Sequence, residues 1–208
     1  MKENKYLSGG QLAGGNSERG RAKNDYYATP TNDVLDFFDK LINRDNEIDI
    51  TDFDRILEPA GGGGHMVDAL EDIFVFSNIG SIDIDPKRED IMKADFLSDD
   101  VVFTGKYYDL VITNPPFKLA KEFIDKSLEI SKRYVMYYLK IQFLEGINRK
   151  EWFKDLPLKY VYVYSYRSNP HRNGSPVDEN GKKWSSTVCY AWYVFDHEYN
   201  GEPIIRWI

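Results

Sequence analysis

The chain has 208 residues, 42% of them hydrophobic, which is enough to bury one good core and makes a single α/β domain the expected architecture. Its one cysteine, Cys189, excludes a disulfide framework and a cysteine-rich metal site and favours a reducing, cytoplasmic setting. No apolar run approaches membrane-spanning length, and residues 1–20 are polar and glycine-rich, unlike a signal peptide. A membrane is therefore not an expected partner.

The net charge of −7 is unevenly distributed along the chain. Residues 25–139 carry a net charge of −12, whereas residues 1–24 and 140–183 carry +3 and +4. The two basic segments could face a polyanion even though the overall balance is acidic. The alternative is that their lysines and arginines are ordinary solvated surface.

Residues 1–24 are glycine-rich and show no hydrophobic periodicity, so we expect them to be flexible alone, or ordered only when substrate or cofactor binds. The cluster Thr31-Asn32-Asp33 then has the composition of a helix cap. Apolar residues at helical spacing follow it and predict the first helix: Val34, Leu35, Phe38, Leu41 and Ile42.

Residues 53–57 read as the first strand, which runs into a turn with four glycines, Gly61 to Gly64, and then a helix over residues 65–73. Glycines after a strand let the backbone approach a ligand closely. The turn is not the dinucleotide fingerprint, because Val67 stands where a third glycine or alanine belongs. Glu58 at the strand tip would repel a pyrophosphate, but it suits a ligand that carries an ammonium and a sulfonium.

A second strand over residues 79–84 contains Asp83, which lies 19 residues after Gly64. This is close to the spacing of about 20 residues at which an acidic side chain receives the ribose hydroxyls of a nucleotide. An Asx turn that ends the strand is the alternative, and it better explains Asp85.

Residues 108–112 form an almost wholly apolar run of strand-forming residues, the pattern of a strand buried on both faces of a parallel sheet. The run leads into Asn114-Pro115-Pro116-Phe117, and two successive prolines cannot continue a strand ladder. The tetrapeptide is therefore expected in a loop at the carboxyl end of the strand, where open α/β sheets bind ligands. An ordinary proline turn is the alternative.

The tetrapeptide has the chemistry of an amine-binding site. Pro116 restrains Pro115, so that the Asn114 side-chain oxygen and the Pro115 carbonyl form a stiff pair of acceptors suited to an NH2 group. Hydrogen bonds from a nucleobase amine or a carboxamide to this pair would strengthen as positive charge develops on nitrogen, which stabilises a transition state. Phe117 offers a ring face to a planar substrate.

The remaining elements follow similar patterns: a helix over residues 119–128, a fifth strand over 134–139, a helix over 143–155, and two last strands over 159–164 and 187–195. Residues 165–186, between the last two strands, are too long and turn-rich for a simple hairpin. Cationic and aromatic side chains in this segment suit a nucleic-acid strand: Tyr166, Arg167, Arg172, Lys182, Lys183 and Trp184. A disordered surface loop is the alternative.

The histidines and the cysteine show no pattern of a metal or nucleophile site. His65, His171 and His197 are far apart, without the carboxylate or cysteine spacing of a metal site, so no metal is expected. Cys189 falls in the predicted last strand without a preceding proline, and we interpret it as core. Cytosine-C5 methylation through a covalent cysteine therefore has no visible nucleophile.

Asn-Pro-Pro-Phe resembles the signature of amino methyltransferases that use S-adenosylmethionine, Asp/Asn/Ser-Pro-Pro-Tyr/Phe/Trp, and is most similar to the adenine-N6 branch. Residues 190–195 and 201–208 also resemble the C-termini of small phage and prophage DNA adenine methyltransferases, which implies a bacterial or phage-infected cell. The implied fold is a Rossmann-like class I methyltransferase: a seven-stranded, mostly parallel α/β sheet with an antiparallel last strand and helices on both faces.

The resemblance also implies a cofactor site. Tyr27 and Thr29 would contact the methionine end of S-adenosyl-L-methionine, Asp83 the ribose and Ile84 the adenine, while Asp95 would accept from the adenine amine beside Phe96. For Asp95 a capping role is the alternative. The other cofactor residues that the resemblance implies are Glu58, Ala60, Gly62, Gly64 and Asn114.

The implied reaction is direct in-line methyl transfer to the N6 amine of an adenine flipped out of DNA, expected to be double-stranded. Asn114, Pro115, Pro116 and Phe117 are the implied catalytic residues. The alternatives are an RNA adenine-N6 or protein-glutamine methyltransferase, a catalytically silent nucleic-acid-binding module, and a nicotinamide dehydrogenase. With about a dozen residues after the seventh predicted strand, target recognition would rest on residues 165–186 or on a second subunit, or specificity would be loose. Monomer and homodimer both stay open.

Overall fold

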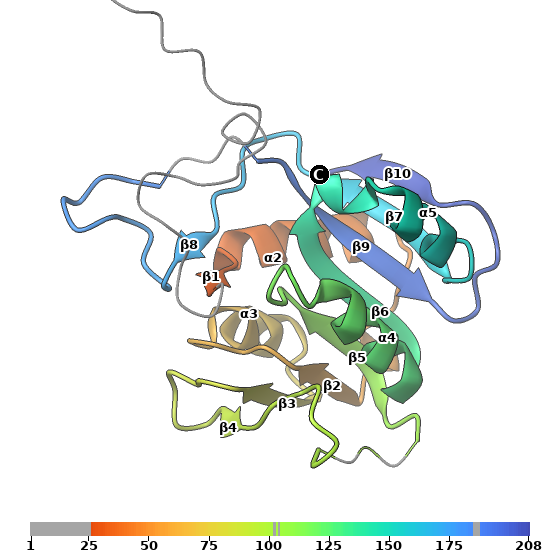
Figure 1. The fold of residues 1–208 in the computed structure, drawn as a ribbon, viewed down its shortest axis with the longest axis horizontal. Coiled ribbons are helices and arrows are strands. Elements are labelled where there is room, and N and C mark those ends of the chain that lie inside the picture. Colours follow the sequence, from red (N-terminus) through yellow and green to blue (C-terminus); the bar gives the residue numbers. More distant parts are fainter. Residues whose placement is uncertain (1–25, 102, 104, 185–187) are drawn as a thin grey trace, which may run out of the picture.

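The computed structural model describes residues 26–101, 103, 105–184 and 188–208, so the predictions for residues 1–24 lie outside the described residues. Eight strands form one mixed sheet in the order β10-β7-β9-β6-β5-β2-β3-β4 (Figure 1). In chain order the strands are β2 (Arg55–Glu58), β3 (Asn78–Asp83), β4 (Met92–Lys93), β5 (Tyr108–Thr113), β6 (Ser131–Lys140), β7 (Leu158–Val163), β9 (Tyr190–Asp196) and β10 (Ile204–Trp207). β9 runs antiparallel to both of its neighbours, and the other pairs are parallel.

The prediction of seven strands is wrong by one, because β10 adds an edge strand parallel to β7. Its residues do not alternate in burial, since Ile204, Ile205 and Trp207 are all exposed. The Arg206 guanidinium fixes the strand instead, at 2.9 Å from the Asp45 carboxylate and 2.7 Å from that of Glu47. These partners lie far away in the sequence, so no local pattern reveals the strand.

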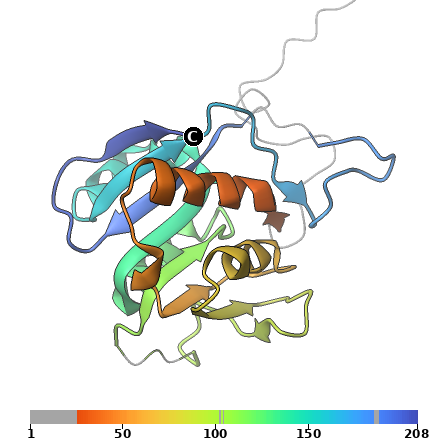
Figure 2. The ribbon, with the colours of Figure 1, turned by 180° about the vertical axis from the view of Figure 1, so that it is seen from behind.

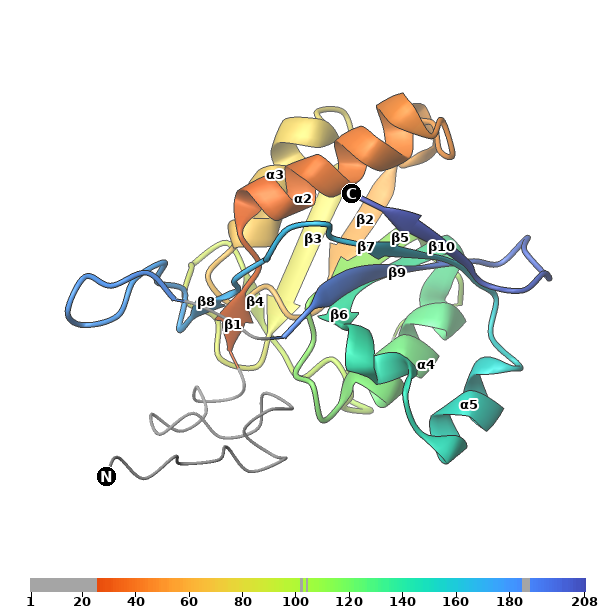
Figure 3. The same ribbon diagram turned by 90° about the horizontal axis from the view of Figure 1, so that it is seen from above.

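Helices cover both faces of the sheet, as predicted (Figures 2 and 3). One face carries α2 (Thr31–Phe38) and α3 (His65–Ile73), and the other carries α4 (Ala120–Ile130) and α5 (Ile147–Phe153). Three short helical segments are also present: η2 (Asp39–Arg44) continues α2, η3 (Ile50–Asp52) precedes β2, and η4 (Ile141–Leu144) lies between β6 and α5. The single helix predicted over residues 143–155 is split into η4 and α5, because Gly146 adopts a φ of +120°, outside the helical region. Within the described ranges, no helix is long and apolar enough to span a bilayer.

Strand β5 lies in the middle of the core, which explains its apolar sequence. Leu110 and Ile112 belong to the hydrophobic cluster beneath α2 and α3, whereas Val111 belongs to the cluster beneath α4, and all three are fully buried. A strand covered on both faces must be apolar at every position. The strand ends at Thr113, immediately before the Asn-Pro-Pro-Phe loop.

A second, two-stranded sheet joins the first described residues to the long segment before β9. β1 (Tyr27–Ala28) pairs antiparallel with β8 (His171–Arg172), and the two strands lie side by side in Figure 3. Ser168 is 4% exposed, and its hydroxyl donates to the buried carboxylate of Asp33. The disordered-loop alternative is therefore wrong for residues 168–172, while residues 185 and 186 lie outside the described part.

Cys189 is exposed, which corrects its interpretation as a core residue. β9 begins one position later, at Tyr190, so the cysteine lies before the buried strand rather than in it. Its sulfur accepts a hydrogen bond from the Arg167 guanidinium at 3.1 Å. The predicted start of the last strand at residue 187 lies outside the described residues.

Candidate functional site

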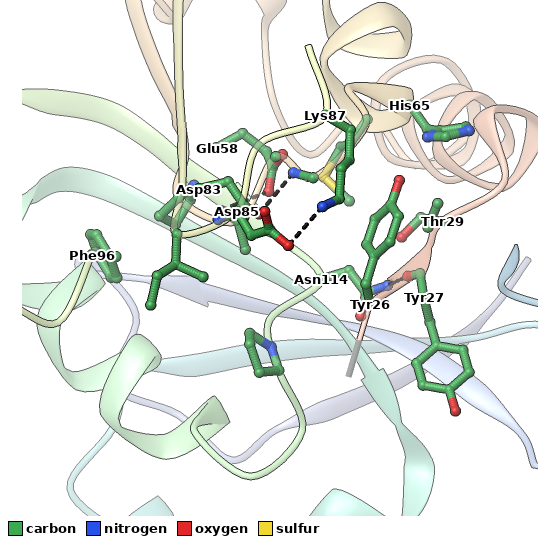
Figure 4. Close-up of a pocket in the computed structure, with 18 of the residues that line it drawn as sticks. Tyr26, Tyr27, Thr29, Glu58, His65, Asp83, Asp85, Lys87, Phe96 and Asn114 are labelled. Atoms are coloured by element: carbon green, nitrogen blue, oxygen red, sulfur yellow. Dashed lines mark hydrogen bonds and ion pairs between the residues drawn. The ribbon is translucent and has the colours of Figure 1, made fainter. Parts of the chain in front are cut away.

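A cavity of about 430 Å³ lies at the carboxyl ends of β2, β3 and β5 (Figure 4). Parallel strands present their carboxyl ends at one edge of a sheet, and the loops that follow them enclose the space there. Here the walls come from residues 26–29 and 58–62, from residues 83–85 with Lys87, and from Asn114 and Pro116. Pro115 is not among the lining residues.

The glycine turn is packed tightly against the end of β3. A Cβ on Gly61 would lie 2.1 Å from the Ser81 hydroxyl oxygen, and Gly62 has a φ of +53°, so neither position readily accepts a side chain. The Gly62 amide donates to Asp83 Oδ2 at 2.8 Å, which ties the turn to the strand end. The glycine turn therefore forms a tightly packed part of the cavity wall.

Asp83, and not Asp85, makes the Asx turn at the end of β3. Its Oδ1 accepts from the Asp85 amide at 2.7 Å, which corrects the assignment of that turn to Asp85. The two backbone bonds fix the carboxylate at the wall of the cavity. Each carboxylate oxygen has a second lone pair, so Asp83 can still receive hydroxyl groups.

Glu58 places a buried carboxyl group in the cavity wall. It is 1% exposed, and its Oε1 accepts from the Thr113 hydroxyl and from the Ala60 amide, the latter at 3.2 Å. Burial raises the pKa of this carboxyl to about 8, despite these two hydrogen bonds that lower it. Without a ligand, Glu58 is therefore mostly protonated near neutral pH, and a cationic ligand in the cavity would favour its ionised form.

Asn114 faces the same cavity as the glycine turn. Its side-chain nitrogen donates to the Tyr27 carbonyl oxygen at 2.6 Å, as Figure 4 shows. This bond fixes the amide plane and leaves the side-chain oxygen to accept from a ligand. An Asn114 amide directed into the core, with no cavity linking it to the glycine turn, would have excluded a role in amine binding.

All but one of the cofactor residues implied by the sequence line this one cavity: Tyr27, Thr29, Glu58, Ala60, Gly62, Asp83, Ile84, Asp95, Phe96 and Asn114. The exception, Gly64, caps α3 with a φ of +82° and lies against the Arg88 guanidinium. Asp95 lines the cavity, and its Oδ1 accepts from the Leu97 amide at 3.0 Å in an Asx turn. No helix begins at this aspartate among the described residues, so a helix-capping role is wrong.

Sequence reasoning missed several lining residues, among them Tyr26, His65, Lys87 and Asn173. The Tyr26 ring lies against Gly62 and Gly63, and burial raises the pKa of its phenol. Its carbonyl accepts from the Asn173 amide at 3.1 Å, so Asn173 reaches the cavity through the pairing of β1 with β8. No local sequence motif identifies Asn173 as a lining residue. Tyr26 could have been identified, because it forms an aromatic pair with Tyr27 shortly before Thr29.

The residues assigned to substrate binding are more scattered. Phe117 does not line the cavity but lies beside it, with its ring centroid 6.0 Å from that of Tyr27. Arg172 lies over the ring of Trp184 at 5.8 Å, while Lys182 and Lys183 are exposed in the segment that projects from the body in Figure 1. The Tyr166 hydroxyl donates to Asp36 on α2 at 2.6 Å, and Arg167 contacts Cys189.

No protein-family model matches the chain, and no curated protein sequence does either. Among solved structures, the chain is similar to a predicted O-methyltransferase from Agrobacterium tumefaciens, with 10% identity over 78% of this chain and 83% of that chain and a TM-score of 0.51. It is also similar to a SAM-dependent O-methyltransferase from Thermotoga maritima (16% identity, 68% and 59% covered, TM-score 0.43). A dimethyladenosine transferase from Plasmodium falciparum is a further similar structure, with 14% identity over 83% of this chain and 64% of that chain and a TM-score of 0.47. At this low identity the likeness to the first structure establishes the fold alone, and the predicted Rossmann-like α/β fold is confirmed.

Proposed function

We propose that the protein transfers the methyl group of S-adenosylmethionine to the exocyclic N6 amine of adenine in DNA. One observation carries the proposal: Glu58 and Asn114, from the ends of the adjacent strands β2 and β5, line one cavity together with the glycine turn. The buried carboxyl suits a cation, and the fixed amide suits an amine.

The cavity fits S-adenosylmethionine better than a nicotinamide dinucleotide. Asp83 places a carboxylate beside the glycine turn, where it would repel a pyrophosphate and attract an ammonium. A cationic ligand would also favour the ionised form of Glu58, whereas a pyrophosphate would not. Asp83 would hold the ribose hydroxyls, and Ile84 and Phe96 supply apolar surface for an adenine ring. When bound, the cofactor supplies an electrophilic methyl group on a positively charged sulfur.

Asn114 and Pro115 would act on the acceptor amine. The amine donates to the Asn114 side-chain oxygen and to the Pro115 carbonyl, which orients the nitrogen lone pair toward the cavity. Both hydrogen bonds strengthen as the nitrogen becomes positive. They would therefore stabilise the transition state more than the ground state. The excess proton then leaves the amine for solvent, so no strong general base is required.

A flipped adenine needs further binding energy. Extrusion from a duplex costs a few kcal/mol, and stacking on Phe117 would offset roughly 1–3 kcal/mol. The exposed cations Arg167, Lys182 and Lys183 would add phosphate contacts, which favours nucleic acid over a protein glutamine as acceptor.

Replacing Asn114 with alanine tests the assignment. Removal of a group that acts mainly in the transition state is expected to lower methyl transfer by about 10²-fold or more. Cofactor affinity, measured by calorimetry, should stay close to that of the wild type. The matched control is Asn43→Ala, which removes an exposed amide that bonds Asp39 on η2. Loss of cofactor binding in Asn114→Ala would show that the roles are misassigned.

A further inference from the structure

Two buried polar atoms in the cavity wall have no hydrogen-bond partner among the described residues: Thr29 Oγ1 and His65 Nδ1. Both side chains line the cavity, and Figure 4 shows them on the side opposite to Phe96. Thr29 is 3% exposed, so its hydroxyl has almost no contact with solvent. A buried polar atom without a partner costs free energy, which a ligand that pairs with it recovers. The two atoms therefore indicate a polar group of the ligand at this end of the cavity.

The surrounding backbone fixes the position of the His65 ring. A Cβ on Gly63 would lie 3.3 Å from His65 Nδ1, so this nitrogen is next to the glycine turn. A Cβ on Gly174 would lie 3.3 Å from Cε1 of the same ring, so the turn after β8 covers the ring from another side. The Thr31 hydroxyl donates to the His65 carbonyl at 3.4 Å and ties the start of α3 to the segment that carries Thr29.

The charges around His65 favour an anion. His65 is the first residue of α3, and the capping residue Gly64 has no side chain to satisfy the first amides of the helix. The amino end of a helix carries a partial positive charge, which attracts an anionic group. Asp68, the acidic residue in the first turn of α3, does not oppose this effect strongly, because it is paired with Arg88.

The amino-acid end of S-adenosylmethionine carries an ammonium and a carboxylate on one carbon, and the cavity offers them different partners. Glu58 and Asp83 supply acidic groups that suit the ammonium. The Thr29 hydroxyl and a His65 ring that holds its proton on Nδ1 are donors without negative charge. Hydrogen bonds from such donors to an ionised oxygen are stronger than those to a neutral one. This end of the cavity therefore fits the carboxylate better than the ammonium.

We infer that His65 and Thr29 bind the carboxylate of the cofactor's amino-acid end, with the imidazole Nδ1–H and the hydroxyl as donors. They make an adenosyl sulfur compound with this carboxylate the preferred ligand over one that lacks it. The inference rests on the proposed function, since it concerns the cofactor named there. It deepens that function by adding His65, which the resemblance to amino methyltransferases does not supply, and by naming the group that the subsite recognises.

Calorimetry with three ligands tests the inference without any methyl transfer. S-adenosylhomocysteine has both the carboxylate and the ammonium, decarboxylated S-adenosylmethionine keeps only the ammonium, and methylthioadenosine has neither. His65→Leu should weaken the binding of S-adenosylhomocysteine about 10- to 100-fold, because a hydrogen bond to a charged group is lost. Its affinity for the other two ligands should stay close to that of the wild type. His65→Asn should bind S-adenosylhomocysteine more tightly than His65→Leu, because its amide can place an N–H near the position of Nδ1.

His197→Leu is the matched control, because His197 is also half-buried, with its Nε2 3.0 Å from the Ser131 hydroxyl oxygen, and it does not line the cavity. Methylthioadenosine binding reports whether each variant is folded. If His65→Leu binds no ligand, Thr29→Val decides in its place, since it keeps the shape of threonine without the hydroxyl and should show the same dependence on the ligand.

Two results would overturn the inference while the proposed function stands. One is an unchanged affinity for S-adenosylhomocysteine in the deciding variant. The other is an equal loss of affinity for S-adenosylhomocysteine and decarboxylated S-adenosylmethionine, which would show that the carboxylate is not the group recognised. A folded wild-type protein that binds none of the three ligands would overturn the proposed function, and with it the inference.

Discussion

Glu58 lies in an environment unlike that of an ordinary exposed carboxylate, because it is 1% exposed. In the unfolded chain it would titrate near 4.5, whereas burial raises its pKa to about 8 in the folded protein. Between these values the folded state holds a proton that the unfolded state has lost. Glu58 therefore contributes stability that is fully present below the unfolded pKa and is lost as the pH rises through the folded pKa.

Glu58→Gln should make the stability of the ligand-free protein less dependent on pH. The amide keeps the hydrogen-bonding shape of the protonated carboxyl, so at and above the folded pKa of about 8 the variant should be more stable than the wild type. The expected difference is on the order of 1–3 kcal/mol. Urea unfolding across this pH range measures it, and parallel curves for the two proteins would contradict the assignment.

The positions of Asn114 and the glycine turn at strand ends could be predicted from the sequence, and so could that of Asp83. Prolines that end a strand and consecutive glycines restrict the backbone to a few conformations, which is why these positions follow from the sequence. The hydrogen bond from Asn114 to the Tyr27 carbonyl joins residues far apart in the chain, and no local pattern predicts it.

At the scale of elements, the pairing of β1 with β8 forms one wall of the cavity. A buried polar cluster holds it in place: Asp33 on α2 accepts from Ser168, whose hydroxyl also bonds that of Tyr138. Burial raises the pKa of the Asp33 carboxyl, and its hydrogen bonds oppose that rise. The cluster links α2, β6 and the segment that carries Asn173, so the cavity wall depends on it.

Ser168→Ala should loosen this wall, because it removes one donor from the buried Asp33 carboxyl. We expect a loss of about 1–3 kcal/mol in the free energy of unfolding. Proteolysis between residues 169 and 184 should also become faster. Ser165→Ala is the control, since that exposed hydroxyl only bonds the terminal Ile208 carbonyl. Equal effects of the two substitutions would show that the buried cluster has no special role.

The elements that sequence predicts best are those with strong local patterns. The helix over residues 65–73 has the bounds of α3, and the apolar run over 108–112 gives β5 to within one residue. β10 and β8 are not predictable in this way, because distant partners define them: Asp45 and Glu47 for the first, and Tyr27 for the second. Short strands of this kind carry little propensity of their own.

At the scale of the whole molecule, the acidic and basic residues are concentrated in different parts of the chain. Residues 25–139, with their net charge of −12, include β2, β3 and β5, which surround the cavity. The basic residues 140–183 include Lys140 beside Phe117 and the projecting segment before β9. The proposed function assigns the acidic part to a cationic cofactor and the basic part to a polyanion, which a net charge of −7 does not exclude.

Removing three exposed charges should weaken DNA binding in a salt-dependent way. In the triple variant Arg167→Gln, Lys182→Gln, Lys183→Gln, the slope of log affinity against log salt should fall by about 1 for each phosphate that the protein no longer neutralises. The control removes the same charge from Lys121, Lys132 and Lys154, which pair with Asp125, Asp109 and Glu151. Fluorescence anisotropy with a labelled duplex measures the salt dependence of DNA binding for both triple variants. Equal slopes for the two variants would contradict a role in DNA binding for Arg167, Lys182 and Lys183.

The most direct measurement is to incubate the protein with methyl-labelled S-adenosylmethionine and, separately, duplex DNA, RNA and protein acceptors. The acceptors are then digested and the labelled product is identified. We expect label in N6-methyladenine from DNA with the wild type, and none with Asn114→Ala. Label only in RNA or protein, or no transfer by a protein that demonstrably binds the cofactor, would contradict the assignment of Asn114 and Glu58 to one DNA adenine methylation site.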